Sequence, residues 1–279
     1  MIGELLDKIA NANDKKALHR EISSLGLEGD ENAIKLLITI LNEGDDVEIK
    51  SYATQALVKI GGRDVVAQLI KSLRNENWVT RMKAAEALGE IKNKKAVNPL
   101  IKLLRTDPQP SVREWAAIAL GNIGSRKATK SLIYCMLQNE NMEVRMEAAT
   151  ALGKIGNKKS LNALLQAYQS DTNYNVRWMA ASSIVKIDEI NSQEIIEDLT
   201  ENLMEIVTNE KDEMILGAAA KTLGEIGDEI AAKVLYKTMK ISKEMVKLEI
   251  NLALGKMAKR FNYRNKDELV DAIKNKNVI

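Results

Sequence analysis

The 279-residue sequence has one phenylalanine, one histidine, one cysteine and three prolines, and aromatic residues make up 4% of it. With so few aromatics, the hydrophobic fraction of 45% must be supplied by Ala, Leu, Ile and Met. β-Sandwiches, barrels and doubly wound sheets need β-branched and aromatic runs that this sequence has few of, and so many aliphatic residues argue against disorder. The composition therefore predicts an all-α fold.

The same scarcities limit the chemistry. Cys135 is the only cysteine, which excludes an intramolecular disulfide, and His19 is the only histidine, which excludes zinc sites built on several histidines. No GxSxG, GxxxxGK[ST] or GxGxxG motif occurs. No apolar stretch approaches the ~18 residues of a membrane span, and the N-terminal residues lack the apolar run of a signal peptide. We expect no metal, no cofactor, no catalytic residue, no membrane contact and a cytoplasmic location.

The most prominent feature that the sequence does have is an internal repeat. Residues 112–124 read VREWAAIALGNIG and residues 144–156 read VRMEAATALGKIG. We take the leucine before the glycine as the anchor of each copy, with a degenerate first copy at Leu25. Each copy has apolar residues at helical spacing and is preceded by a second apolar helical pattern, so each is a pair of helices. The other anchors, spaced by 31, 32, 32, 32, 39 and 31 residues, are Leu57, Leu88, Leu120, Leu152, Ile184, Leu223 and Leu254.

The pattern VRxxAAxALGxIG resembles the HEAT-like repeat of the phycobilisome-lyase type over about residues 30–260. This resemblance implies helix pairs, A and B, in which helix B lines the concave surface. We predict one continuous right-handed α-solenoid, 1–279, of about eight HEAT-like helix pairs. Residues 1–30 form a degenerate capping repeat, 31–260 the regular repeats and 261–279 a C-terminal capping helix. The 39-residue step predicts an insertion around Asp188 to Ile195, as a longer loop or an extended helix A.

Two columns of the repeat are interpreted as packing features. Alanines one, three and four positions before the anchor, together with the glycine after it, let neighbouring helices approach closely. An arginine seven positions before the anchor recurs together with an Asn or Asp six residues before it, and we expect the guanidinium groups to tie these turns to the neighbouring unit. The arginines are Arg81, Arg113, Arg145 and Arg177. In the turn at residues 107–111, two prolines should end one helix and Ser111 should cap the next.

The candidate partner-binding residues lie at outward positions of helix B, six, five and two residues before the anchor and two after it. Polar residues are the default there, yet apolar side chains recur, and such a strip is typical of a partner site. Methionine suits it because its thioether adapts to another protein's surface. The alternative is that curvature buries these side chains against the next repeat. The groove strip comprises Tyr52, Met82, Trp115, Ile118, Met146, Trp178 and Met179.

A basic column lies in the loops between repeats and could bind a nucleic-acid backbone or an acidic protein. The net charge of +2 and the pI of about 8.4 are, however, far below those of most dedicated nucleic-acid binders. This basic loop edge comprises Arg63, Lys94, Lys95, Arg126, Lys127, Lys158 and Lys159. The two ends of the chain also differ in net charge, which is −6 over residues 1–48 and +7 over residues 233–276. Such polarity either steers a charged partner or reflects two solvated caps.

We predict a protein that is not an enzyme: a scaffold or adaptor that binds a protein or an extended peptide in its concave groove, as a subunit of a larger complex. Trp115 and Trp178 would be its anchors. One alternative is nucleic-acid binding, including the activity of HEAT-like DNA-alkylation glycosylases, which the chain resembles more faintly through Trp115, Trp178 and Glu114. The other alternative, implied by the phycobilisome-lyase resemblance, is a chromophore-lyase or assembly-chaperone subunit.

Overall fold

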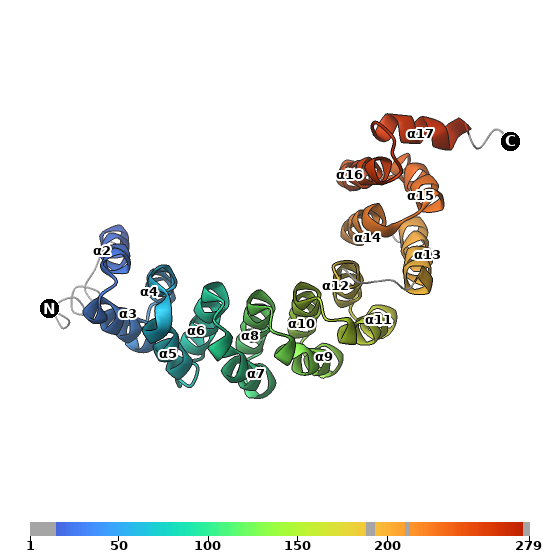
Figure 1. Ribbon diagram of the computed structural model, residues 1–279. Coiled ribbons are helices and arrows are strands. Elements are labelled where there is room, and N and C mark those ends of the chain that lie inside the picture. The colour runs from blue at the N-terminus through green and yellow to red at the C-terminus, as the bar shows by residue number, and fades with distance from the viewer. Residues whose placement is uncertain (1–14, 188–192, 210–212, 276–279) are drawn as a thin grey trace. The chain divides into compact units, whose positions relative to one another are not determined.

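The computed structural model describes residues 15–187, 193–209 and 213–275, and within these ranges every regular element is a helix. The chain divides into two compact units, Met1–Ile155 and Gly156–Ile279, which we call unit 1 and unit 2. In each unit, helices A and B alternate along the chain and stack in two rows (Figure 1). The predicted all-α solenoid is therefore confirmed. That residues 1–279 form one continuous domain stays a prediction.

Unit 1 holds the degenerate first copy and four regular ones. The even-numbered helices are helices B and form one row, while the odd-numbered helices A form the other (Figure 1). Short 3-10 turns, η1 (Lys94–Ala96) and η2 (Arg126–Ala128), precede α7 and α9. The helices are α2 (Lys15–Glu28), α3 (Glu31–Glu43), α4 (Val47–Ile60), α5 (Gly62–Ser72), α6 (Trp78–Ile91), α7 (Val97–Thr106), α8 (Pro110–Ile123), α9 (Thr129–Gln138) and α10 (Met142–Ile155).

Unit 2 continues the alternation with helices B at α12, α14 and α16, and it begins with the turn η3 (Lys158–Ser160). Helix A of its second copy, α13, has 17 residues against 10 in α11, so the 39-residue step includes an extended helix A, as predicted. Residues 188–192, where the insertion begins, lie outside the described residues. The helices are α11 (Leu161–Ser170), α12 (Tyr174–Val185), α13 (Gln193–Asn209), α14 (Glu213–Ile226), α15 (Glu229–Met239), α16 (Glu244–Arg260) and α17 (Lys266–Asn275).

The anchor residues form the centre of each stack. Each predicted anchor falls within a helix B, and from Leu57 to Leu254 none exposes more than 1% of its surface. The repeated alanines of α6, α8 and α10 are equally buried. Because the side chains at these positions are short, the backbones of successive helices B pack closely against one another. The repeat pattern therefore placed the core correctly.

The glycine after the anchor marks the closest approach between helices B. A Cβ atom at Gly121 of α8 would lie 2.8 Å from the Cα of Ala151 in α10, and one at Gly224 of α14 would lie 2.8 Å from the Cα of Ala253 in α16. Even the degenerate copy keeps this contact, since a Cβ at Gly26 would lie 3.0 Å from the Ala56 Cβ. Glycine is required here because backbone, not a flexible side chain, fills the space.

The arginine column is structural, as predicted. Arg81 donates from Nε and Nη2 to both carboxylate oxygens of Asp107, at 2.6 and 2.9 Å, and thereby ties its turn to the next repeat. Its Nη1 donates to the carbonyl of Asn75, six residues before it. The same bond to the residue six positions earlier is made by the other three members of the column, Arg113, Arg145 and Arg177.

The cap predicted for α8 is wrong. The helix begins at Pro110, so Ser111 lies inside its first turn, and the preceding Gln109 makes no side-chain cap bond. Proline suits the first helical position because its missing N–H would have no partner there and its φ is already helical. Asp107 organises the turn instead, since its Oδ1 accepts a bond from the Gln109 amide.

Among the described residues, none of the helices combines the length and the apolar character that crossing a lipid bilayer requires.

Candidate functional site

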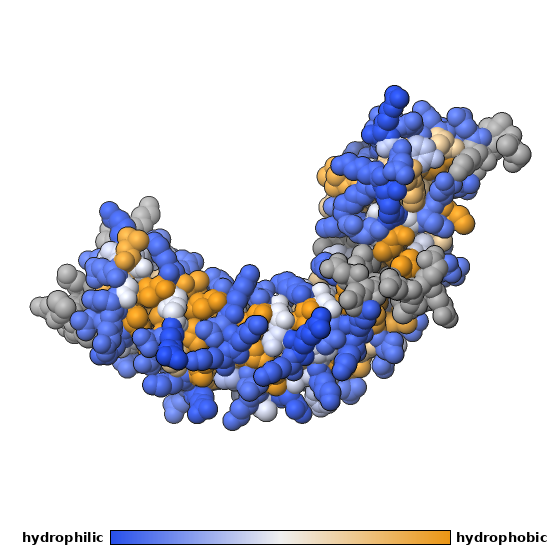
Figure 2. Space-filling view, viewed as in Figure 1, coloured by the Kyte–Doolittle hydropathy of each residue, from blue (hydrophilic) through white to orange (hydrophobic). Residues whose placement is uncertain are grey.

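The five groove-strip residues of unit 1 lie on four successive helices B. Each is half-buried, and binding of a partner by the strip stays a prediction. Figure 2 shows hydrophobic residues reaching the surface between hydrophilic ones along this unit. The strip here comprises Tyr52 on α4, Met82 on α6, Trp115 and Ile118 on α8, and Met146 on α10.

Tyr52 is the member of the strip most engaged within its own unit. Its ring stacks on that of His19, with centroids 4.2 Å apart, and its hydroxyl donates to Glu48 Oε1 at 2.6 Å. His19 is thus a helix residue in contact with the strip rather than a ligand. These contacts hold the tyrosine ring in place at the end of the strip.

Two carboxylates lie beside the aromatic and methionine side chains. Burial raises the pKa of Glu114 on α8, and the nearby charges of Glu147 and Glu143 raise it further. Burial also raises the pKa of Glu147 on α10, against the opposing effect of Lys154. Burial thus favours the neutral, protonated form of both carboxyl groups.

The basic loop edge is exposed throughout, as expected of loop residues that need not pack. Lys94 and Lys95 lie in η1, Arg126 and Lys127 in η2, and Arg63 in the first turn of α5, all in unit 1. Lys158 and Lys159 lie in η3 of unit 2. Binding of a nucleic acid or an acidic protein by this edge stays a prediction.

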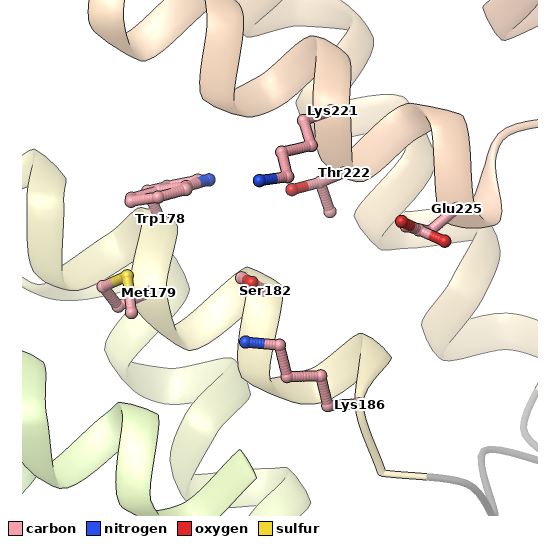
Figure 3. Close-up of a pocket in the computed structure, with 7 residues that line it drawn as sticks. All are labelled: Trp178, Met179, Ser182, Lys186, Lys221, Thr222 and Glu225. Atoms are coloured by element: carbon pink, nitrogen blue, oxygen red, sulfur yellow. The ribbon is translucent and has the colours of Figure 1, made fainter. Parts of the chain in front are cut away.

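A pocket of about 380 Å³ opens between α12 and α14 in unit 2 (Figure 3). The two groove-strip residues of this unit, Trp178 and Met179, are among the residues that line it. An indole ring and a thioether give the pocket an apolar wall, and hydroxyl, ammonium and carboxylate groups complete it. The remaining lining residues are Ser182, Lys186, Lys221, Thr222 and Glu225.

The polar groups of this pocket leave a surplus of positive charge. Glu225 is paired with Lys256 of α16. Neither Lys186 nor Lys221 has an acidic partner or a hydrogen bond among the residues that the structure describes. The indole Nε1 of Trp178 is buried and, within the same residues, has no acceptor. Within this part of the chain, the pocket therefore offers two unpaired ammonium groups and an indole donor, and its one carboxylate is already in an ion pair.

Sequence reasoning missed the two lysines. Ser182 and Lys221 occupy the position two residues before the anchors Ile184 and Leu223, and Lys186 and Glu225 the position two after them. These are outward positions of the repeat, so the register could have found them. A polar residue at an outward position is the default, however, so the sequence does not distinguish these two lysines from solvated surface residues.

Within the described residues, no group of three or more histidine, cysteine, aspartate or glutamate side chains could hold a metal ion. Cys135 of α9 is 2% exposed, and burial raises the pKa of its thiol to about 11. A thiol in that state is a poor nucleophile and a poor ligand. The described residues thus give no sign of metal or thiolate chemistry.

The chain is similar to known proteins in both sequence and structure. The HEAT-repeat family matches residues 34–121, 97–185 and 163–255. Phycocyanobilin lyase subunit beta of Nostoc sp. (strain PCC 7120) is 30% identical over 116 residues, which cover 42% of this chain and 57% of that protein. The chain thus spans little more than half of this curated relative.

Among solved structures, Kap121p superposes with a TM-score of 0.69 at 16% identity, covering 92% of this chain and 33% of Kap121p. The complex of CpcE and CpcF of phycocyanin lyase from Nostoc sp. PCC7120 has a TM-score of 0.43 at 23% identity, covering 88% of this chain and 91% of that chain. The likeness to Kap121p confirms the solenoid fold.

These findings correct one prediction and confirm another. The prediction that the protein is not an enzyme is wrong, because the similarity to a lyase subunit points to an enzyme-associated function. The resemblance to the phycobilisome-lyase type of repeat is confirmed by the same relative. Because the family matches extend from residue 34 to residue 255, the chain belongs to the family of HEAT-repeat proteins.

Proposed function

We propose that this protein is a subunit of a lyase that acts on phycocyanobilin or a related conjugated pigment. The observation that carries the proposal is the 30% identity to phycocyanobilin lyase subunit beta. The repeat alone supports it less, because one solenoid fold hosts many functions. The designation of that relative as a beta subunit implies a second subunit in the enzyme, so we expect this chain to act with a protein partner as well.

The groove strip of unit 1 is the surface proposed for that partner. Its five members are half-buried side chains on successive helices B, at positions where the repeat itself requires no apolar residue. Aromatic anchors in a partly desolvated groove are the residues that most often dominate a protein interface. Trp115 is the central member, with Met82 and Met146 on the helices at either side.

The division of labour within the proposed subunit follows from its chemistry. The described residues contain no metal cluster and no activated thiol, so we assign this chain binding and positioning rather than bond making. Holding two reactants in place is itself a large contribution to rate, because a bimolecular step then becomes effectively unimolecular. The solenoid supplies one surface for the protein and one pocket for the pigment.

The proposal is tested by reconstitution. The chain is produced together with apo-phycocyanin, a source of phycocyanobilin and the second subunit of the Nostoc lyase, and control cells lack the chain. We expect more pigment to stay with phycocyanin after denaturation when the chain is present, and less when it carries Trp115→Ala. Equal pigmentation with and without the chain, or failure of the purified chain to bind phycocyanobilin, would overturn the proposal.

A further inference from the structure

The pocket between α12 and α14 contains a polar arrangement that its own residues leave incomplete. Figure 3 shows the indole nitrogen of Trp178 and the ammonium group of Lys221 pointing toward one another from facing helices. An indole N–H only donates hydrogen bonds, and an ammonium group only donates them as well. Neither donor has an acceptor among the described residues. The indole nitrogen is buried, whereas Lys221 is exposed. A buried donor is normally satisfied, so the missing component is an acceptor for the indole N–H, on the side that Lys221 faces.

The charges around the pocket specify what kind of acceptor it is. Lys186, the residue directly after α12, points toward Ser182 and adds a second ammonium group to the same site (Figure 3). The one acidic lining residue, Glu225, is paired with Lys256 and does not neutralise the two lysines. An anionic acceptor is favoured over a neutral one, because hydrogen bonds to a charged acceptor are roughly twice as strong.

The apolar wall of the pocket indicates what kind of molecule carries the anionic group. The ring of Trp178 and the thioether of Met179, two consecutive residues of α12, lie on the α12 side of the pocket. Flat conjugated molecules stack on an indole ring, and a thioether adapts to their edges. A cavity of about 380 Å³ is within the range of sites that take up small molecules.

We propose that this pocket binds a flat conjugated molecule through a carboxylate, which accepts hydrogen bonds from the Trp178 indole and the Lys221 ammonium group. Lys186 pairs with the same or a second carboxylate of the ligand. The inference rests on the proposed function for the identity of the ligand, since phycocyanobilin is a conjugated molecule with two propionate groups. The pocket chemistry itself requires only the ring system and the carboxylate.

The experiment uses the full-length chain and two forms of the pigment. Phycocyanobilin and its dimethyl ester share the conjugated body, but only the free acid carries carboxylates. Binding of each is titrated by pigment absorbance at low and high salt. We expect the parent chain to prefer the free acid by roughly tenfold or more, the range typical of a charge-assisted hydrogen bond. Salt should reduce this preference.

Three variants locate the binding. Lys221→Gln should abolish the preference for the acid, and Trp178→Phe, which keeps a stacking ring but removes the donor, should weaken binding of the acid more than binding of the ester. Lys237→Gln is the matched control, because it removes one exposed lysine from α15 of the same unit, outside the pocket. Equal binding of acid and ester by the parent chain, or an unchanged preference in Lys221→Gln, would overturn the inference.

A probe unrelated to pigments separates the two proposals. Naphthalene-2-carboxylate has a flat ring and a carboxylate but no tetrapyrrole. Suppose that naphthalene-2-carboxylate binds the parent chain but not Lys221→Gln, and that phycocyanobilin binds neither. The carboxylate site then stands and the lyase proposal fails. If phycocyanobilin binds equally well to every variant, the lyase proposal stands and the site is overturned. Binding of neither probe overturns both.

Discussion

The close approach of helices B predicts opposite effects for the same substitution at two glycines. In Gly121→Ala, the new methyl group would lie 2.8 Å from the Cα and 2.9 Å from the Cβ of Ala151. Packed carbon atoms lie ~3.5–4.0 Å apart, so α8 and α10 must separate by about 1 Å. Overpacking costs up to ~3 kcal/mol, and the higher helix propensity of alanine offsets ~1 kcal/mol of this. We expect a net loss of about 2 kcal/mol in the free energy of unfolding.

The matched control is Gly255→Ala in α16. A Cβ atom at Gly255 would have no other atom within 4 Å, so only the helix propensity changes, and we expect a gain of up to ~1 kcal/mol. The measurement is urea denaturation followed by circular dichroism, with midpoints and slopes compared across parent and both variants. If Gly121→Ala proves as stable as the parent chain, the glycine is not required by the helix contact and the stacking geometry described for unit 1 is wrong.

Three further substitutions or treatments test other contacts. Arg81→Met should lower the free energy of unfolding by ~3 kcal/mol or more in a melting experiment, because it leaves the buried Asp107 carboxylate without its ion-pair partner. A loss below ~1 kcal/mol would show that this ion pair does not hold the two repeats together. Because the pKa of Glu147 is raised in the folded chain, the Glu147 carboxyl group stays protonated to higher pH there than in the unfolded chain. The free energy of unfolding therefore falls as pH rises above the ordinary pKa of 4.5. Glu147→Gln should flatten that pH dependence. A thiol reagent should label Cys135 at neutral pH far more slowly in native than in denatured protein; equal rates would contradict its burial.

Much of the fold was predictable because the repeat imposes the same environment many times. A leucine that recurs every 31 or 32 residues beside a glycine can only be a stacked core position, and Leu88, Leu120 and Leu152 are fully buried. The arginine column was predictable for a related reason, since each guanidinium meets the same turn carbonyl. The cap at Ser111 was mispredicted because Pro110, directly before it, suits the first helical position, so the helix begins one residue earlier.

The candidate site was only half predictable. Trp178 and Met179 stood out because apolar residues are unusual at outward positions. The register places Lys186 and Lys221 at outward positions too, but they match the polar default there. What singles out the lysines is the absence of a partner, together with the facing indole nitrogen, and both depend on how α12 packs against α14. Pairing between side chains of neighbouring helices is a property of packing, which a single sequence does not display.

The most direct test of the proposed pigment-binding subunit is a crystal structure of the full-length chain grown with phycocyanobilin. We expect electron density for the pigment in the pocket between α12 and α14, stacked on Trp178, with one propionate between the indole Nε1 and Lys221 Nζ. Pigment density on another surface, or a propionate that points into solvent away from both donors, would contradict the central claim.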